Sequence, residues 1–356
     1  MVSVIGFDIG GANTKATFLK SENHKIKELK TVLEYFPVWK SGKSKIPNIL
    51  EKLKNRLAKS KPLEGIGVTI TAELSDVFIT KKEGINHILD CLCRVFNGIP
   101  IFVLNVKTDL VSVEEAKKNA LMVASANWAA TGWITKQMIK DCIIVDVGST
   151  STSIIPIANG EVAVEGRTDL EKLQNGELVY SGVLRTNVAT IVNSIKVHGN
   201  KTRVSSELFA QSGDVHLLLN NITEDDYTSD TCDGRGKTHI EAAARLARVV
   251  CADLDMLNEQ DIIEMAKFVY QKQIVQIANG LKQVKERFNH KKNTAVVTGI
   301  GRKFLARKAA EYVGFEEIID MNELVGADVA VASPSVGIAV MVANKLEGKT
   351  VECKRF

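Results

Sequence analysis

The sequence carries little net charge, lacks a C-x-x-C cysteine pair and has no long apolar run. Its 46 basic and 42 acidic residues leave +4 over 356 residues, which gives no case for nucleic-acid binding. No apolar stretch approaches the roughly 18 residues of a membrane span, and no basic and apolar leader precedes the first strand. Six cysteines in this arrangement are typical of a reducing compartment rather than a zinc site. We therefore expect a cytoplasmic protein without a membrane or nucleic-acid partner.

Two phosphate-binding fingerprints are also missing from the glycine-containing stretch at residues 4–19. No Gly-Lys-Ser/Thr follows its glycines, as a Walker loop requires, and no helix opens after them, as a dinucleotide fingerprint requires. The stretch instead predicts a strand that ends at Asp8, a turn at Gly10 and Gly11, and a returning strand. Because glycine adopts positive φ without steric cost, we expect both glycines in the left-handed region. This pattern is a β-hairpin with a carboxylate at its tip.

The same hairpin pattern occurs again at residues 143–157, with its acid 138 residues further along. The aligned pairs are Asp8 with Asp146, Gly10 with Gly148, Gly11 with Ser149 and Asn13 with Ser151. The repeat indicates a duplicated fold with domains at residues 1–138 and 139–356, the second carrying a helical insertion. We expect both hairpins to face one cleft, where backbone N–H groups and hydroxyls bind anionic oxygens. The alternative is that Asp and Gly simply end two buried strands.

Hydrophobic periodicity predicts strands alternating with helices, and hence an α/β layer structure. Strands are expected at residues 26–35, 66–70, 101–104 and 294–298. Helices are expected at residues 85–96, 113–134, 241–257 and 261–288, with a lysine-rich helix between residues 40 and 61 and another helix near Glu207. A third glycine turn, at Gly299 and Gly301, separates the last strand from a helix expected at residues 302–312. A helix N-terminus after glycines suits an anion or a nucleotide.

The two hairpins and the strand-glycine-helix element together resemble the phosphate-1, phosphate-2 and adenosine elements of the actin, sugar-kinase and Hsp70 superfamily. The resemblance spans the whole chain and implies two ribonuclease-H-like α/β domains around a central cleft that holds metal and phosphates. It implies a first phosphate loop at Asp8, Gly10, Gly11, Asn13, Thr14 and Lys15, a second at Asp146, Gly148, Ser149, Thr150 and Ser151, and a nucleoside site at Gly299 and Gly301.

Segments between these motifs resemble a narrower group, the hydantoinase/oxoprolinase-related branch tied to archaeal methanofuran metabolism. They are residues 69–78, 127–133, 180–186, 233–235 and 245–248. The resemblance implies a transferase that joins a furanmethyl diphosphate to the phenol of γ-glutamyltyramine and releases diphosphate. One position departs from the branch: Ser153 stands where relatives often carry an acid in the second loop. We therefore expect that ATP is not consumed, although the third glycine turn leaves ATP binding open.

Candidate roles follow from this chemistry. Asp8 and Asp146 would hold Mg²⁺ or another divalent cation, and Lys15 with the Ser/Thr loop would stabilise the departing diphosphate. Glu73 is the first candidate for taking the proton of the phenol, whose ordinary pKa is about 10. Lys15 is equally compatible with an exposed strand lysine, and Glu73 with a surface or capping acid.

Two tryptophans and two arginines are further candidates for substrate binding. Trp128, together with Trp133, would wall an aromatic substrate, although aromatic residues at helical spacing also form cores. Arg185 and Arg235 would clamp glutamyl carboxylates, although structural ion pairs leave the same pattern.

Two other functions remain open on the sequence. One is an ATP-dependent kinase or amidohydrolase of the same fold, and the other is a non-catalytic nucleotide-binding regulator. The sequence leaves the oligomeric state open, with a homodimer as one option.

Overall fold

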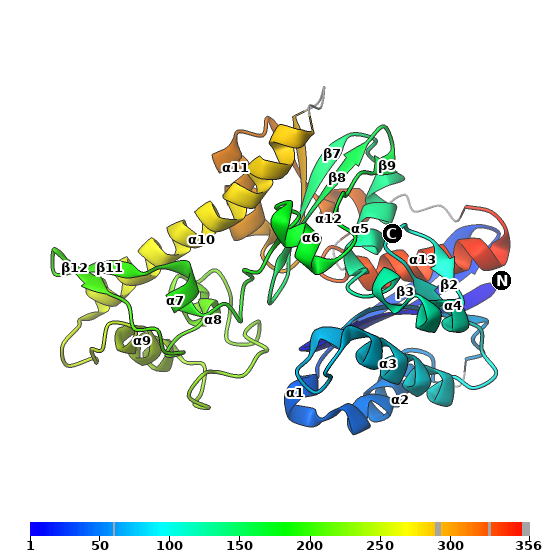
Figure 1. Ribbon diagram of the computed structural model, residues 1–356, viewed down its shortest axis with the longest axis horizontal. Coiled ribbons are helices and arrows are strands. Elements are labelled where there is room, and N and C mark those ends of the chain that lie inside the picture. Colours follow the sequence, from blue (N-terminus) through cyan, green and yellow to red (C-terminus); the bar gives the residue numbers. More distant parts are fainter. Residues whose placement is uncertain (60, 289–292, 327–328, 351–356) are drawn as a thin grey trace. The chain divides into compact units, whose positions relative to one another are not determined.

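The computed structural model describes the chain except for residues 60, 289–292, 327–328 and 351–356 (Figure 1). It forms two compact units, each built from separated segments. The first unit comprises Met1–Cys142, Ile155–Lys172 and Asp320–Phe356, and the second comprises Ile143–Ile154 and Leu173–Ile319. The division into domains at residues 1–138 and 139–356, made from the sequence, stays a prediction. None of the helices in the described ranges is both long and apolar enough to cross a membrane.

The first unit is built on a six-stranded mixed sheet in the order β3-β2-β1-β4-β5-β6. Strands β1, β2 and β3 form an antiparallel meander, whereas β1, β4 and β5 run parallel. Because parallel strands end at the same edge, the carboxyl ends of β1 and β4 lie together. The strand bounds are Val2–Gly10 (β1), Asn13–Glu22 (β2), Lys25–Tyr35 (β3), Gly65–Thr71 (β4), Ile101–Leu104 (β5) and Leu110–Val111 (β6).

The second sheet repeats this strand order as β10-β8-β7-β13-β14, with β9 paired to β8. Strands β7 and β13 are parallel, as β1 and β4 are. The two sheets therefore share a core arrangement of a hairpin followed by a parallel neighbour. The bounds are Cys142–Val147 (β7), Thr152–Ala158 (β8), Glu161–Val162 (β9), Leu178–Val179 (β10), Thr294–Thr298 (β13) and Glu317–Asp320 (β14).

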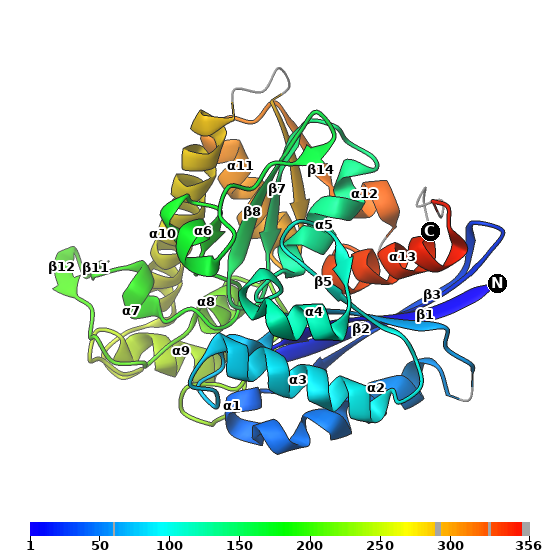
Figure 2. The same ribbon diagram turned by 45° about the vertical axis from the view of Figure 1, so that its right-hand side comes forward.

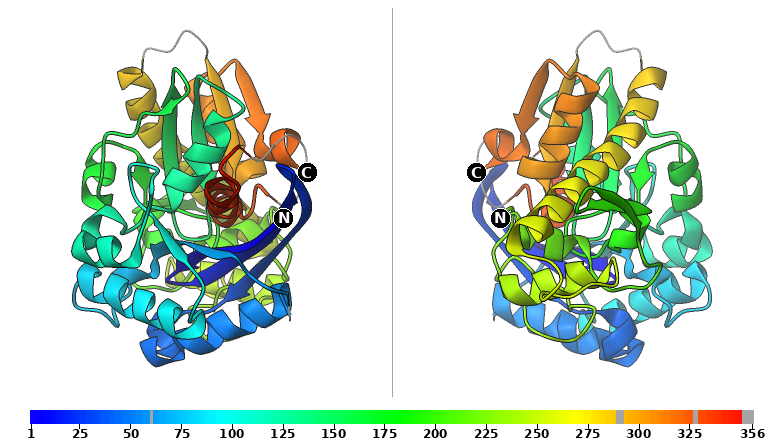
Figure 3. Two further views of the ribbon diagram at one scale, coloured as in Figure 1. Left: turned by 90° about the vertical axis from the view of Figure 1, so that its right-hand side faces the viewer. Right: turned by 90° about the vertical axis from the view of Figure 1, so that its left-hand side faces the viewer.

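Helices cover both faces of the first sheet (Figure 2). On one face, the apolar stripes of α2 and α3 pack into a cluster that includes Phe7, Leu50 and Leu89. On the other face, the C-terminal helix α13 lies directly on β1 and β4 (Figure 3, left). The bounds of these and the short helices of this unit are Val38–Ser41 (α1), Ile46–Leu57 (α2), Lys81–Val95 (α3), Val113–Lys118 (α4), Asn127–Lys136 (α5), Asp169–Gln174 (α6), Met321–Val325 (α12) and Ser333–Glu347 (α13), with 3₁₀ turns at Lys43–Lys45, Ala72–Leu74 and Ala120–Met122.

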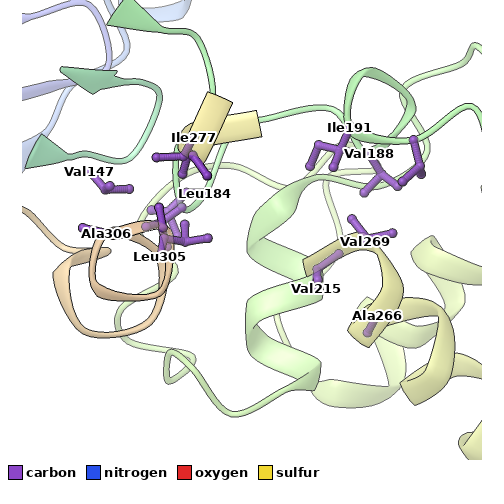
Figure 4. Packing of buried hydrophobic residues seen from close by; sticks show 14 of the residues in the cluster. Val147, Leu184, Val188, Ile191, Val215, Ala266, Val269, Ile277, Leu305 and Ala306 are labelled. Carbon is purple, nitrogen blue, oxygen red and sulfur yellow. The ribbon is translucent and has the colours of Figure 1, made fainter. Parts of the chain in front are cut away.

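The second unit is organised along the long helix α10, Glu259–Arg287 (Figure 1). Figure 4 shows Ile277 beside Val147 and Leu184 near one part of this helix, and Val269 beside Val215 further along it. One apolar core thus follows α10 from the second sheet to the smaller helices. The remaining bounds are Val188–Ile191 (α7), Ser194–Val197 (β11), Asn200–Arg203 (β12), Ser212–Leu218 (α8), His239–Arg248 (α9), Arg302–Ala306 (a π-helical turn) and Arg307–Val313 (α11).

The structure confirms the expected strands at 26–35, 66–70, 101–104 and 294–298 and the helices at 85–96 and 261–288 to within a few residues. The single helix expected at 113–134 is wrong, because residues 119–126 leave the helix to contact β4. The helix near Glu207 is also wrong, since the next helix starts at Ser212. The helix at 241–257 ends early, at Arg248, and the helix at 302–312 begins with a π-helical turn.

The seating of α13 depends on glycines in β1 and β4. A Cβ at Gly6 would lie 2.3 Å from the carbonyl oxygen of Ser335 and 2.7 Å from the nitrogen of Ala339. A Cβ at Gly67 would lie 2.7 Å from the side chain of Ile338. The helix therefore approaches the sheet at backbone contact distance.

We expect Gly6→Ala to lower the free energy of unfolding by about 3 kcal/mol, because the clash is with backbone atoms that no rotamer change relieves. Urea denaturation followed by circular dichroism measures the change. Gly11→Ala is the matched control, since its Cβ would meet no atom within 4 Å. A Gly6→Ala protein as stable as the wild type would contradict this packing.

Candidate active site

The first hairpin places Asp8 between two polar neighbours on adjacent strands. Asp8 pairs with Lys15 of β2 in the antiparallel ladder and with Thr69 of β4 in the parallel ladder. Side chains of directly paired residues share one face of a sheet, so these three lie together. The Lys15 Nζ is 3.7 Å from Asp8 Oδ2, and the Lys15 side chain is 21% exposed. Lys15 therefore faces the acid and is not a free surface lysine.

Asp8 is a carboxylate held in the protein interior. Its residue is 5% exposed, and burial raises the pKa of Asp8 while the charge of Lys15 opposes that rise. Within the described part of the chain, Asp8 Oδ1 and Thr69 Oγ1 are buried without a hydrogen-bond partner. Buried polar atoms are normally satisfied, so these two oxygens mark a place where a ligand would complete the set. Carboxylate and hydroxyl oxygens suit a hydrated divalent cation.

Gly10 of the first loop is required because a side chain would not fit there, and not because of left-handed geometry. Neither Gly10 nor Gly11 has positive φ, so that expectation is wrong. A Cβ at Gly10 would lie 2.6 Å from the carbonyl oxygen of Asn13, whereas a Cβ at Gly11 would meet nothing within 4 Å. Val38 donates its N–H to the carbonyl oxygen of Gly11, which fixes the loop from outside. Thr14, which the sequence assigned to this loop, lies in β2 and is buried.

The second hairpin repeats the first at the level of backbone pairing. Asp146 at the end of β7 pairs with Thr298 of β13, as Asp8 pairs with Thr69. The turn closes with a hydrogen bond of 2.9 Å from the N–H of Gly148 to the carbonyl oxygen of Ser151. The predicted repeat therefore extends to a threonine on the neighbouring parallel strand, which the sequence comparison of the hairpins did not include.

Residues 182–185 lie along the second loop and cover its backbone. Val183 and Leu184 donate their N–H groups to the carbonyl oxygens of Gly148 and Ser149, each at 2.9 Å. Arg185 Nη1 donates to Thr150 Oγ1 at 3.2 Å. Arg185 thus contacts the second loop, whereas the sequence had suggested that it binds substrate carboxylates.

The third glycine turn packs against the same loop. Gly299 has φ +83°, and a Cβ there would lie 2.6 Å from Asp146 Oδ1, so only glycine fits. Gly301 donates its N–H to the carbonyl oxygen of Val147 at 3.0 Å. The second loop and the third glycine turn are therefore one continuous site in the second unit.

Glu73 anchors a separate polar cluster beyond the end of β4. It is 1% exposed, and burial raises its pKa to about 7 against the opposing hydrogen bond from Ser125. Ser125 Oγ lies 2.7 Å from Glu73 Oε1 and 2.6 Å from Asp169 Oδ2. Lys81 Nζ lies 2.7 Å from Asp169 Oδ2 and 4.0 Å from Glu73 Oε1. Glu73 is thus a buried titrating group and not a surface acid.

The two tryptophan candidates lie on α5. Trp128 is buried, and the Lys172 Nζ lies 4.8 Å from the centroid of its ring, while Trp133 is half-buried. Arg235 is exposed in a loop, where its carbonyl oxygen accepts a hydrogen bond from Thr231 Oγ1. In the described ranges, no three His, Cys, Asp or Glu side chains gather into a ready-made metal site.

Comparison with known proteins adds the following findings. A family model described as hydantoinase/oxoprolinase matches residues 64–343. A curated protein of Methanocaldococcus jannaschii, "(4-{4-[2-(gamma-L-glutamylamino)ethyl]phenoxymethyl}furan-2-yl)methanamine synthase", is 40% identical over 97% of this chain and 99% of its own. A protein of Methanococcus vannielii with the same name is 38% identical over 61% of this chain and 97% of its own.

A solved structure of a nucleotide-free acetone carboxylase is similar in fold. It has a TM-score of 0.59 at 12% identity, over 95% of this chain and 70% of that chain. The chain has the α/β fold of the actin, sugar-kinase and Hsp70 type, as its motifs predicted.

The burial of Glu73 makes a testable prediction about stability. The folded protein binds the Glu73 proton up to about pH 7, whereas a glutamate with the ordinary pKa of 4.5 loses it earlier. The stability that Glu73 contributes is therefore full below pH 4.5 and is lost as the pH rises towards 7. We expect the free energy of unfolding of Glu73→Gln, relative to that of the wild type, to rise by about 3 kcal/mol between pH 4.5 and pH 7.

Denaturation of both proteins in acidic and in mildly alkaline buffer measures this difference. Glu22→Gln, at an exposed glutamate, is the control and should show no such trend. A stability difference between Glu73→Gln and the wild type that does not change with pH would show that Glu73 does not titrate in this range.

Proposed function

The chain belongs to the hydantoinase/oxoprolinase family, and from this premise we propose that it is a transferase of methanofuran biosynthesis. It joins 5-(aminomethyl)-3-furanmethanol diphosphate to γ-glutamyltyramine and releases diphosphate. The observation that carries the proposal is the match to the Methanocaldococcus jannaschii synthase over nearly the full length of both chains. The product that this synthase's name describes has a phenol oxygen joined through a CH₂ group to a furan ring.

The reaction exchanges one carbon–oxygen bond for another. The bond between the furan CH₂ and the diphosphate oxygen breaks, and the electron pair leaves with diphosphate. The phenol oxygen forms the new bond to the CH₂ group and loses its proton. Because the electron-rich furan stabilises positive charge at the CH₂ group, the enzyme's main tasks are to stabilise diphosphate and to accept the proton.

The two acid-tipped hairpins are assigned to the diphosphate. Asp8 and Asp146 would hold Mg²⁺, which neutralises developing charge on phosphate oxygens when bound. The unpartnered Oδ1 of buried Asp8 is compatible with this role. Lys15, beside Asp8, and Arg185, beside Thr150, supply positive charge close to the two loops.

Glu73 is assigned to the phenol proton. Two observations support this: its side chain is fully buried at the same strand edge as Asp8, and its pKa is raised to about 7. A carboxyl group that titrates near neutral pH is suited to proton transfer under physiological conditions.

An ATP-dependent kinase or amidohydrolase, or a nucleotide-binding regulator, is not favoured. The third glycine turn is the element that would hold a nucleoside in such a protein. The full-length relative is instead a synthase, and Ser153 of this chain lies in β8 paired with Leu178. We propose that ATP is not consumed.

The proposal is tested by product analysis. Incubation with Mg²⁺, the furanmethyl diphosphate and γ-glutamyltyramine should yield the aryl ether and one diphosphate per ether, without added ATP. Mass spectrometry detects the ether, and a coupled assay detects diphosphate. Release of ADP from ATP with no ether formed would overturn the proposal in favour of a kinase or amidohydrolase.

We expect a fall in kcat of about 10² or more in each of Asp8→Asn and Asp146→Asn. Each substitution removes the negative charge of a carboxylate proposed to bind the cation, while the shape of the side chain is nearly unchanged. Circular dichroism checks that both variants fold. Asp90→Asn is the matched control, since Asp90 is an exposed acid paired with Lys117. Full activity of both variants at the same metal concentration would show that Asp8 and Asp146 only end their strands and do not bind the metal.

A further inference from the structure

We infer that Ser125 and Asp169 are positioning residues of a proton relay that carries the phenol proton from buried Glu73 towards solvent. The inference rests on the proposed ether-forming reaction and extends it to the fate of the proton. Glu73 Oε1, Ser125 Oγ and Asp169 Oδ2 form a chain of two short contacts, 2.7 Å and 2.6 Å. Glu73 is 1% exposed, whereas the Asp169 side chain is 17% exposed.

Ser125 has too few hydrogens to donate to both of its carboxyl neighbours. A serine hydroxyl has one hydrogen, so it donates to one carboxylate and accepts from any second partner. Ser125 Oγ nevertheless lies at hydrogen-bond distance from two carboxyl groups. Both contacts are hydrogen bonds only when one carboxyl group carries a proton and donates it to Ser125. The cluster is therefore built to hold one shared proton.

The surroundings place that proton on Glu73. The charged groups that face Glu73 are Lys81 of α3 and Asp169 of α6, and Lys81 is closer to Asp169, at 2.7 Å, than to Glu73, at 4.0 Å. Lys81 therefore pairs mainly with Asp169 rather than with Glu73. Burial raises the pKa of Glu73 to about 7, which agrees with this assignment. In the resting cluster, Glu73 donates to Ser125, and Ser125 donates to Asp169.

The second oxygen of Glu73 is left for a ligand. Among the residues that the structure describes, no group forms a hydrogen bond with Glu73 Oε2, although this atom is buried. A protonated glutamate cannot accept a second proton unless it releases its own, and the relay provides the acceptor for that released proton. Oε2 accepts the phenol proton, Oε1 passes its own proton to Ser125, and Ser125 passes its proton to Asp169. One proton enters and one leaves, and no charge accumulates on Glu73.

Backbone contacts hold the relay at the end of β4. Glu73 follows Thr71, which pairs with Gly10 of the first loop. Ser125 donates its N–H to the carbonyl oxygen of Ile70 at 2.9 Å and has φ +52°, a conformation that serine rarely adopts. A Cβ at Gly84 would lie 2.6 Å from Glu73 Cα, so α3 packs directly on the backbone of Glu73. Strain of this kind persists where the surrounding structure requires it.

The test is the pH dependence of kcat in Ser125→Ala and Asp169→Asn. Without the relay, Glu73 accepts a proton only when it is ionised, so the variants should need a higher pH than the wild type. At about pH 6, where only about a tenth of Glu73 with a pKa of about 7 is ionised, we expect a loss of kcat about 10-fold larger than the loss at about pH 9. Ser335→Ala and Asp90→Asn are matched controls at a buried core serine and an exposed ion-paired acid. Equal losses at both pH values, or no loss, would overturn the relay.

Infrared difference spectroscopy provides a measurement that does not depend on turnover. At about pH 6 the wild type should show the C=O band of a protonated carboxyl group that is absent in Glu73→Gln. The band should shift in frequency in Ser125→Ala, because its hydrogen-bond partner is lost. Absence of the band from the wild type would overturn the inference. Failure of the wild type to make ether would overturn the proposed function, and the spectra would still decide the state of Glu73.

Discussion

The parallel pairing of β1 with β4, repeated by β7 with β13, is the constraint on which the candidate site depends. It sets Asp8 opposite Thr69 and Asp146 opposite Thr298. A slip of one residue in either ladder would turn the acid to the opposite face of its sheet. The loops, the glycine turn after β13 and the cluster around Glu73 all follow directly from the ends of these four strands. The site is thus specified first by backbone hydrogen bonds and only then by side chains.

The sequence predicted the parts of this arrangement that are local. Strand alternation and the repeated Asp-Gly pattern identified both hairpins, because each signal lies within about ten residues. Ser125 and Asp169 gave no signal, since their contacts join residues 44 and 52 positions apart. The helix expected across residues 113–134 breaks because Ser125 bonds to the end of β4, a tertiary contact that overrides local propensity. Positive φ at Gly10 was wrong because the loop is fixed by other backbone contacts.

Buried charges in this chain serve two different purposes. Asp214 and Arg245 are both fully buried, and Arg245 Nε donates to Asp214 Oδ1 at 2.8 Å. Tyr227 and the N–H of Gln211 also donate to Asp214, so both oxygens of this carboxylate have partners within the protein. Glu73 and Asp8 each keep one buried oxygen without a partner in the described ranges. Burying a carboxyl oxygen without a hydrogen-bond partner costs free energy. Such a cost is expected at a site where a bound ligand supplies the missing partner.

The close packing of α13 on Gly6 and Gly67 has a consequence for how the protein folds while it is being translated. Synthesis proceeds from the N-terminus, so β1 is made long before α13, the helix that covers one of its faces. Until then, the face of β1 and β4 on which α13 lies is without this helix. An N-terminal unit that cannot complete its core during translation is exposed to aggregation and to chaperone binding. The order of synthesis therefore delays the completion of the first unit until α13 has been made.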